Sequence, residues 1–393
     1  MTPPNFDEII ERRGTHSAKW DNMETYYGLS PEDGLPMWVA DMDFRPPACV
    51  TEALQAYVDH GVFGYFGDDT AYRDAVAWWQ KTRHGWTIDT GAIFTTHGLV
   101  NGTGLCLQAF TEPGDGVVLL TPVYHAFARV IRAADRKVVE CPLALTNGRY
   151  EMDFDRWDAQ MTGAEKMLIL CSPHNPGGRV WTQEELEGVA AFAERHDLIL
   201  VSDEIHNDLV MPGHRHLPMA LACPGIADRL VMMTATTKTF NLAGGHTGNV
   251  IVHDAALRRR FEKVMGALGI SANSFGLHMA TAAYTPAGAE YVDALCAYLD
   301  GNRQLFDAGI AAIPGLRSMP LEGTYLAWVD FAGTGMESAE VQRRILKEAK
   351  IAVNYGDAFG SGGETFQRFN LATPRARIEE AVARMQKAFA DLQ

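Results

Sequence analysis

Short apolar segments alternate with amphipathic helical patterns along this chain from about residue 47 to residue 286. One helical pattern, at residues 183–195, carries apolar residues at three-and-four spacing, and Thr182 with Glu185 resembles a capping box at its start. Seven short runs rich in β-branched or apolar residues are the strand candidates, at residues 92–95, 117–121, 137–141, 167–171, 198–202, 230–234 and 249–252. Strands that alternate with helices predict an α/β fold with a mostly parallel seven-stranded sheet between helices.

The pattern changes after about residue 286. A long helical stretch reaches about residue 313, and the chain closes with a helix whose apolar stripe indicates packing rather than partner binding. Between them lie a strand-like, a helical and a second strand-like segment, at residues 324–331, 338–350 and 366–371. We therefore expect a large domain at residues 48–286 and a smaller α+β domain that joins residues 1–47 to residues 287–393.

Composition excludes several classes of partner. A chain of 393 residues with 47% hydrophobic content can bury a large core, and its net charge of -15 argues against binding nucleic acid, because such binding needs cations that neutralise phosphates. The six cysteines form no CxxC pair, so neither a disulfide framework nor a metal site is indicated. The start lacks the pattern of a secretory signal, and no apolar run approaches the roughly 20 residues that span a membrane. We expect a cytoplasmic protein.

A lysine follows the strand candidate at residues 230–234. Lys238 lies among hydroxyl residues, in the segment Ala235-Thr-Thr-Lys238-Thr-Phe-Asn241. Ligands of open α/β sheets bind at the carboxyl ends of the strands, and a desolvated lysine there is a good nucleophile. Most lysines near strand ends are solvated surface groups, so Lys238 by itself is a weak indication of a site.

Two further strand candidates end in polar residues. Residues 198–202 lead into Asp203, and a carboxylate at the mouth of a sheet is costly unless it is paired. A protonated pyridine nitrogen is one partner that would keep it ionised, although a helix cap or an ion pair would also explain it. Residues 167–171 lead into a turn rich in Pro and Gly that can present Asn175 to a site.

Three more features complete the candidate site. Gly98, Leu99 and Val100 open a helical stretch after a strand, where free backbone N–H groups suit a phosphate. No phosphate loop or dinucleotide fingerprint accompanies them, which disfavours nucleotide binding. Tyr124 could lie against a flat heterocycle, and Arg368, on a strand near the C-terminus, could bind a carboxylate with both arms.

The order of these residues resembles the fold-type I pyridoxal-phosphate enzymes, the class I and II aminotransferase superfamily, along nearly the whole chain. Within it, the chain is most similar to the MalY/PatB-type carbon–sulfur β-lyases, the group of cystathionine β-lyases and cystalysin. The segments that carry this likeness are Met37-Trp-Val-Ala-Asp-Met-Asp-Phe44, Phe63-Gly-Tyr-Phe66, Arg83-His-Gly-Trp86, Asp203-Glu-Ile-His206, Lys238-Thr-Phe-Asn-Leu-Ala-Gly244 and Glu322-Gly-Thr-Tyr-Leu326.

The resemblance implies a role for each matched position. Lys238 would hold pyridoxal 5'-phosphate as a Schiff base and later move the α-proton of the substrate. Asp203 would keep the pyridine nitrogen protonated, Asn175 would bond to the ring hydroxyl, and Tyr124 would stack on the ring. The backbone around Gly98, Leu99 and Val100 would hold the phosphate. His206 is assigned to the same cofactor site, where a purely structural role would explain it equally well.

The resemblance also implies a homodimer with a shared active site, in which Tyr65 reaches the phosphate of the second subunit. Arg368 would clamp the α-carboxylate of an amino-acid substrate. Asn175, Val39 and Ala40 are the remaining candidates for substrate binding.

One part of the site departs from the superfamily. Many members place a serine three residues before the lysine and an arginine eight residues after it, both on the phosphate, whereas this chain has Ala235 and His246. Thr236, Thr237 and His246 are the candidates to replace those contacts, and Thr237 is assigned to the cofactor.

The expected reaction is the α,β-elimination of cystathionine, or of a related cysteine S-conjugate, to pyruvate, ammonia and a thiol. The alternative is transamination between an amino acid and a 2-oxo acid, which uses the same residues. No second arginine is assignable to a dicarboxylate side chain, which argues mildly against an aspartate-specific aminotransferase. A binding or regulatory protein without turnover would be expected to lack the lysine, and Lys238 is present.

Overall fold

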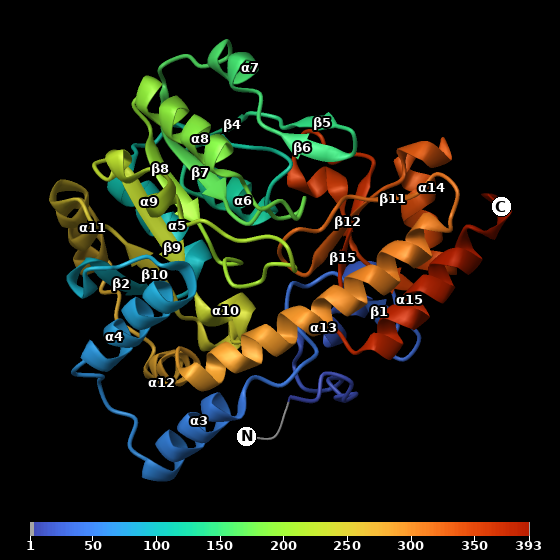
Figure 1. Cartoon of the computed structure of the whole chain (residues 1–393), viewed down its shortest axis with the longest axis horizontal. Helices are drawn as coiled ribbons and strands as arrows, with labels where there is room; N and C mark the ends of the chain where they lie inside the picture. The colour runs from blue at the N-terminus through green and yellow to red at the C-terminus, as the bar shows by residue number, and fades with distance from the viewer. Residues whose placement is uncertain (1–3, 393) are drawn as a thin grey trace.

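The computed structural model describes residues 4–392, and its centre is a seven-stranded sheet in the order β2-β10-β9-β8-β7-β3-β4 (Figure 1). The strands are β2 Ile93–Thr96, β3 Gly116–Leu119, β4 Lys137–Glu140, β7 Glu165–Cys171, β8 Ile199–Asp203, β9 Leu230–Thr234 and β10 Gly248–Ile251. All pair in parallel except β10, which is antiparallel to both of its neighbours. The predicted α/β fold and its seven strands are confirmed, with strand bounds within two residues.

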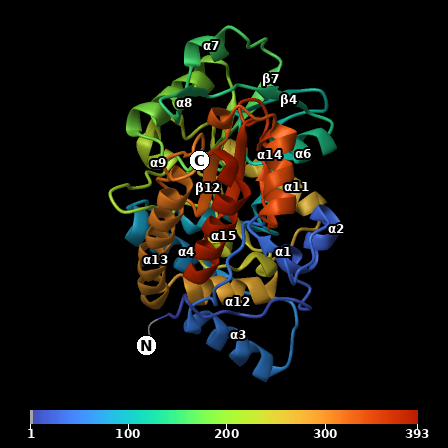
Figure 2. The same cartoon turned by 90° about the vertical axis from the view of Figure 1, so that its right-hand side faces the viewer.

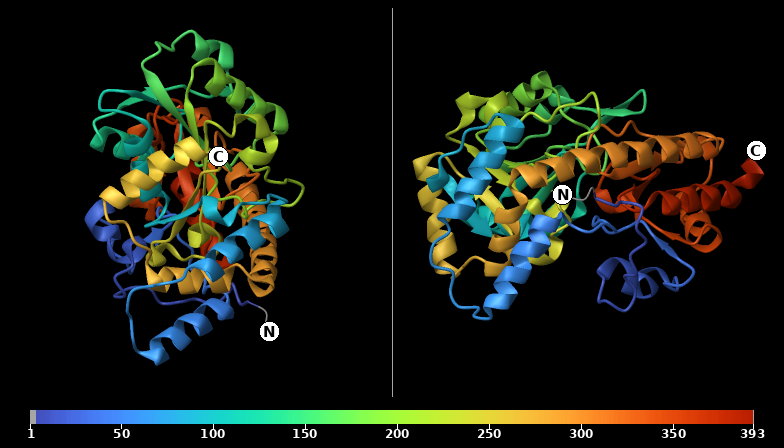
Figure 3. Two further views of the ribbon diagram at one scale, coloured as in Figure 1. Left: turned by 90° about the vertical axis from the view of Figure 1, so that its left-hand side faces the viewer. Right: turned by 60° about the horizontal axis from the view of Figure 1, so that its bottom comes forward.

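Helices cover both faces of this sheet (Figures 1 and 3). They include α5 Leu99–Phe110, α6 His125–Ala133, α8 Gln183–Arg195, α9 Met219–Ala222 and α11 Ala255–Ala267. The apolar side chains of α5, α6 and α11 form one buried cluster with one face of the sheet. Helix α8 begins with the predicted capping box, because the Thr182 hydroxyl accepts from the Glu185 N–H and the Glu185 carboxylate accepts from the Thr182 N–H.

A second, antiparallel sheet lies in the C-terminal part, in the order β11-β12-β15-β14. Its strands are β11 Arg317–Ser318, β12 Leu326–Asp330, β14 Asn354–Tyr355 and β15 Phe366–Asn370. The helices around it are α13 Pro286–Ala311, α14 Ser338–Arg343 and α15 Arg375–Ala388, with α13 packed along α15 (Figure 2). The predicted helix at residues 338–350 is shorter than expected, because α14 widens into a π-helical turn at Arg344–Glu348.

The first residues of the chain join this second sheet region. Strand β1 Leu35–Pro36 pairs in parallel with β13 Ile351–Ala352. This supports placing residues 1–47 with residues 287–393, and we propose the division at residues 48 and 286 on that basis. Two-residue strands carry too little local signal to be predicted from the sequence.

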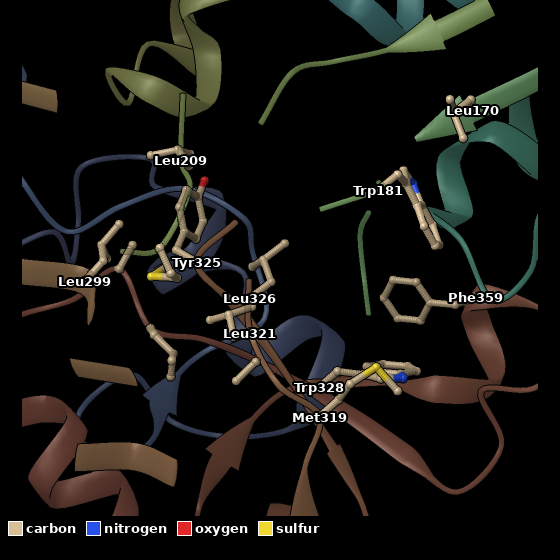
Figure 4. Close-up of a cluster of buried hydrophobic side chains, with 14 of the residues drawn as sticks. Leu170, Trp181, Leu209, Leu299, Met319, Leu321, Tyr325, Leu326, Trp328 and Phe359 are labelled. Atoms are coloured by element: carbon tan, nitrogen blue, oxygen red, sulfur yellow. The ribbon is translucent and has the colours of Figure 1, made fainter. Parts of the chain in front are cut away.

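Figure 4 shows the apolar core between the two sheets. Leu170 and Trp181 come from the large sheet region, and Tyr325, Trp328 and Phe359 come from the smaller one. All five side chains belong to one buried cluster, so the two sheets share a core. The shared core fixes the C-terminal residues relative to the strand ends of the large sheet.

The remaining elements are short or peripheral. They are α1 Ala18–Asp21, α2 Met23–Tyr27, α3 Ala48–His60, α4 Thr70–Trp79, α7 Phe154–Asp158, α10 Thr236–Thr239, α12 Ser274–Ala283 and the hairpin of β5 Ala144–Thr146 with β6 Arg149–Glu151. Within residues 4–392, none of the helices has the length and apolar character that a membrane crossing requires. All six cysteines are free thiols.

Candidate active site

Three neighbouring strands deliver the predicted polar residues to one edge of the large sheet. Strands β7, β8 and β9 are adjacent and parallel, and their register places Cys171 beside Asp203 and Asp203 beside Met233. Asn175 lies four residues beyond the end of β7, and Lys238 lies on the short helix α10 that follows β9. The carboxyl edge of the sheet is therefore the candidate site, as the sequence predicts.

Lys238 is half-buried, and its amine faces the N-terminal part of the chain. Its Nζ donates a hydrogen bond to the carbonyl oxygen of Ala40 at 2.6 Å. Burial lowers the pKa of Lys238 to about 8, with a further lowering from the Arg368 charge, while Asp41 and Asp203 act in the opposite direction. About a tenth of the amine is therefore neutral at pH 7, far more than for an ordinary lysine, which suits a nucleophile and a proton acceptor.

Asp203 is buried with few partners. Its Oδ1 accepts one hydrogen bond, from the Ile205 N–H at 3.1 Å, and no cation donates to it among the described residues. Burial raises the pKa of Asp203 to about 7, and the Ile205 bond and the Lys238 charge only partly oppose this. A buried carboxyl without a cation is costly, and a ligand that brings a positive N–H would relieve the cost.

Arg368 and Asn175 meet across the two sheets. The Arg368 guanidinium donates to Asn175 Oδ1 at 3.0 Å, to the Trp38 carbonyl oxygen at 2.9 Å and to Asn354 Oδ1. It is 2% exposed, and burial lowers its pKa to about 10, which leaves it cationic. Its Nε has no hydrogen-bond partner among the described residues, and the planar face of the group lies 5.1 Å from the Phe359 ring centre. A buried guanidinium with a free Nε donor is suited to binding a carboxylate.

Tyr124 and His206 complete the walls of the site. Tyr124 is half-buried, and burial raises the pKa of its hydroxyl, with charge effects from Arg368 and Asp203 that show their proximity. His206 is 1% exposed and its Nδ1 has no partner in the described residues. Burial and the nearby charges of Lys238 and Arg368 lower the pKa of His206 well below its usual value, so the ring is neutral. Both side chains lie within reach of the Arg368 charge, as Lys238 does.

The N-terminus of α5 forms the other end of the site. Gly98, with φ of +86°, precedes the helix, and a Cβ at this position would meet nothing within 4 Å. The backbone N–H groups of Leu99 and Val100 donate to no acceptor within residues 4–392. Free N–H groups at the start of a helix suit an anion such as a phosphate. Thr237 is half-buried on α10, whereas His246 is exposed with φ of +44°.

A strap from the N-terminal part crosses this site, and we call residues 37–44 the N-terminal strap. Asn241 accepts from the Met42 N–H and donates to the Met42 and Phe44 carbonyls. Asn370 donates to the carbonyls of Val39 and Asp41. The N–H groups of Val39 and Ala40 donate to no acceptor in the described chain, so they remain able to contact a substrate.

Sequence reasoning missed three residues that shape the site. Tyr325 is 1% exposed and donates to the Ala40 carbonyl at 2.8 Å, so it shares that acceptor with Lys238. Asn241 and Asn370 hold the strap. Tyr325 and Asn241 lie inside segments that carried the family likeness, which was the only signal for them.

Tyr65 is the one predicted residue that stands apart from this cluster in a single chain. Its side chain is fully exposed, beside the exposed apolar side chains of Val62, Phe63 and Phe66. A single chain therefore leaves Tyr65 without a place in its own site.

Comparison with known proteins agrees with this arrangement. The model of the family "Aminotransferase class I and II" matches residues 33–385. The chain is 38% identical to cystathionine beta-lyase PatB of Bacillus subtilis, covering 98% of this chain and 99% of that protein. It is 32% identical to the protein MalY of Escherichia coli, covering 96% and 97%. The crystal structure of cystalysin from Treponema denticola, which contains pyridoxal 5'-phosphate, superposes with a TM-score of 0.94 at 36% identity, covering 99% and 100%.

The fold and the site define a pyridoxal-phosphate enzyme of fold type I, and the matched residues cover both sheet regions. The chain belongs to the class I and II aminotransferase family, within its group of cystathionine β-lyase-like proteins.

Proposed function

We propose that this protein is a pyridoxal-phosphate-dependent carbon–sulfur β-lyase that converts cystathionine, or a related cysteine S-conjugate, into pyruvate, ammonia and a thiol. The observation that carries the proposal is the meeting of Lys238, Asp203 and Arg368 at one sheet edge, in a chain 38% identical to a cystathionine β-lyase along its whole length.

The residues present fit the cofactor. Asp203 is a buried carboxyl whose only hydrogen bond comes from a backbone N–H, so it has room for the N–H of a protonated pyridine ring. Lys238 would bond covalently to the cofactor, and the amides of Leu99 and Val100 would hold the phosphate. When bound, the cofactor would supply an electron sink for the carbanion that forms at the α-carbon.

The remaining cofactor contacts belong to the same proposal. Tyr124 would lie against the ring, Asn175 would bond to the ring hydroxyl, and Gly98 would let the backbone approach the phosphate. Thr237 replaces the missing serine as a side-chain donor to the phosphate, since His246 is exposed and Thr236 is buried. His206 would face the ring as a neutral group.

Substrate binding and proton transfer fall to the chain's own side chains. Arg368 would bind the α-carboxylate, and the free N–H groups of Val39 and Ala40 would direct the substrate beneath the strap. The amine of Lys238, with its lowered pKa, would take the α-proton. The bond from Cβ to sulfur would then break, and the thiolate would leave. Holding the α C–H bond in line with Lys238 is a positioning task that the Arg368 clamp would perform.

We also propose a homodimer with a shared site. A surface that exposes Val62, Phe63, Tyr65 and Phe66 together is typical of a protein–protein contact. A second copy would cover this surface and place Tyr65 on the phosphate of its partner. Six free thiols fit a reducing compartment, and we place the enzyme in the cytoplasm.

Transamination is the second candidate, because the matching family model covers aminotransferases. The residues above would serve both reactions up to proton removal. The lyase produces pyruvate continuously without an added 2-oxo acid, whereas an aminotransferase requires an acceptor.

The test is incubation of the purified protein with cystathionine and no 2-oxo acid. We expect sustained pyruvate release, and an absorbance band at about 420 nm from the lysine-bound cofactor. Lys238→Ala should abolish both, while Lys263→Ala, an exposed lysine on α11, should leave both unchanged. Strict dependence on an added 2-oxo acid would replace the lyase with the aminotransferase, and a protein that cannot take up the cofactor would exclude both.

A further inference from the structure

Two histidine–carboxylate pairs lie buried beneath the site, outside the residues assigned above. His84 Nε2 lies 2.9 Å from Asp208 Oδ1, and His216 Nε2 lies 2.8 Å from Glu204 Oε2. The side chains are at most 7% exposed. The two imidazole rings meet edge to face, with centres 5.6 Å apart.

Asp208 is held by three side-chain donors. Besides His84, it accepts hydrogen bonds from Trp79 Nε1 at 3.0 Å and from the Thr239 hydroxyl at 2.9 Å. Burial would raise the pKa of Asp208, but the bonds from His84 and Thr239 outweigh it and lower the pKa, so the carboxylate is ionised. Arg83, Tyr284 and Cys296 are the other titratable groups that face it.

Thr239 is the residue that follows Lys238, on the helix α10. This helix has four residues, too few to keep its shape from its own hydrogen bonds. Two side-chain anchors follow the lysine instead. Thr239, the next residue, donates to Asp208, and Asn241, two residues beyond Thr239, binds the N-terminal strap.

The direction of the Lys238 side chain depends on how α10 is turned about its axis. Successive residues of a helix point about 100° apart, so an anchored Thr239 fixes the direction in which Lys238 leaves the helix. An apolar side chain in place of Asp208 could fill the same space without the cost of a buried charge. It would not hold a hydroxyl in one direction, because hydrophobic contact has no directional preference.

We infer that the His84–Asp208 pair is a positioning device that holds the Thr239 hydroxyl and thereby aims the Lys238 amine at the Ala40 carbonyl and the cofactor. Among the described residues, neither His84 nor Asp208 has a hydrogen bond to Lys238, Asp203 or Arg368, so the pair acts through Thr239. The inference rests on the proposed function for the role of Lys238.

The second pair provides a matched control. Glu204 accepts from His216, from the Ser202 hydroxyl at 3.0 Å and from the Met219 N–H at 2.9 Å. None of these donors lies on α10. The two pairs match in chemistry and burial, and only the first holds the segment that carries Lys238. Glu204 adjoins Asp203 and its charge raises the pKa of Asp203, so the control change is made at His216.

The experiment follows attachment of the cofactor to full-length protein. The cofactor is removed, pyridoxal 5'-phosphate is added, and the absorbance band at about 420 nm reports the bond between the Lys238 amine and the aldehyde, which forms with loss of one water. We expect Asp208→Leu and Thr239→Val each to slow this step by about tenfold, because the amine is no longer aimed, and Thr239→Ser to keep it within about twofold of wild type. His216→Gln, which breaks the second pair and keeps the Glu204 charge, should lower Tm and leave the rate within about twofold.

Steady-state assays on the reconstituted proteins give a second readout. A misdirected proton acceptor lowers kcat more than it raises KM, so Thr239→Val should show that split and Thr239→Ser should not. If Thr239→Val does not fold, Thr239→Cys supplies a similar shape with a weaker donor and a smaller expected loss.

The outcomes separate the two proposals. A wild-type protein that never develops the band would overturn the proposed function. If wild type develops the band, normal attachment in Asp208→Leu or in Thr239→Val would overturn the positioning role alone. An equal slowing in His216→Gln would overturn it as well.

Discussion

Two fully buried aspartates of this chain have opposite pKa shifts. Asp203, at the end of β8, has one backbone donor, and burial raises its pKa to about 7. Asp43, at the end of the strap, is 1% exposed, and its pKa is held far below the usual value. Its carboxylate pairs with Arg12 at 2.9 Å, Lys19 at 2.9 Å and Arg377 at 3.1 Å. It also accepts hydrogen bonds from the Trp20 indole N–H and the Thr373 hydroxyl.

The difference in partners distinguishes an aspartate with a structural role, Asp43, from one that we assign to cofactor binding, Asp203. The charge of Asp43 is satisfied by side chains of this protein, so Asp43 ties the strap to the helices around it. No cation within the described residues donates a hydrogen bond to Asp203, so a bound ligand with a positive N–H would be needed to satisfy its charge. Burial alone would raise both pKa values, and the charges of Lys19 and Arg377 beside Asp43 reverse the sign there.

The largest effect should come from Asp203→Asn. This change removes the charge that would hold the cofactor ring protonated, and we expect kcat for pyruvate release to fall by roughly a thousandfold. The apoprotein should be no less stable than wild type, because a costly carboxyl has been replaced by a neutral amide of the same shape. Turnover assays and urea unfolding measure the two quantities. Loss of stability with normal turnover would reverse the assignment of the two aspartates.

Asp43→Asn should give the opposite result. It leaves Arg12, Lys19 and Arg377 around a neutral group, which should lower the free energy of unfolding by about 4 kcal/mol. The matched control is Asp33→Asn, because Asp33 pairs with Lys350 at 3.0 Å on the surface, and its loss should cost less than about 0.5 kcal/mol. Equal losses in the two variants, measured by urea unfolding, would contradict the structural role of Asp43.

The pH dependence of the apoprotein's free energy of unfolding tests the contrast between Asp203 and Asp43 further. The pKa of Asp203 is about 7 in the folded chain against 3.8 in the unfolded chain, so between these values the folded state binds the extra proton. Its contribution to stability is therefore present below pH 3.8 and is lost as the pH rises through 7. Relative to Asp203→Asn, wild type should lose about 2 to 3 kcal/mol between pH 4.5 and pH 7.5.

Cofactor binding should remove this dependence, since a ring N–H beside Asp203 lowers its pKa. Urea unfolding of both proteins at the two pH values, with and without pyridoxal 5'-phosphate, is the measurement. Parallel stability curves of the two apoproteins would show that Asp203 is ionised without a ligand.

The features that the sequence could predict depend on local patterns, and those that it could not predict depend on contacts between distant residues. The seven strands form from local apolar runs, and the end of each run indicates which side chains reach the carboxyl edge of the sheet. The sequence could therefore place Asn175, Asp203 and Lys238 at that edge. The strap is held by contacts between residues far apart in the chain, such as Asn370 with Val39 and Lys238 with Ala40. No local pattern encodes those pairs.

The buried histidine pairs and the shared core were missed for the same reason. His84 and Asp208 are separated by 124 residues, and each looks like an isolated polar residue in its own segment. Tyr65 was assigned only from the family likeness, and it is fully exposed in a single chain, so its contact with a phosphate stays a prediction.

The smallest effect should come from Tyr325→Phe, which removes one of the two hydrogen bonds to the Ala40 carbonyl oxygen on the strap. The Ala40 oxygen accepts from both Tyr325 at 2.8 Å and Lys238 at 2.6 Å. Without the tyrosine donor, the oxygen bonds more strongly to the lysine ammonium, which favours the charged form and raises the pKa of Lys238. The acidic limb of the kcat profile should move to higher pH, because the base must be neutral to take the α-proton.

At neutral pH, the shifted acidic limb of Tyr325→Phe corresponds to a loss of about threefold in kcat, the size expected for one hydrogen bond. Tyr26→Phe is the control, because Tyr26 is exposed and its loss should leave the profile unchanged. If Tyr325→Phe does not move the acidic limb, the Ala40 carbonyl does not tune the amine, and the lowered pKa of Lys238 depends on burial and on Arg368 alone.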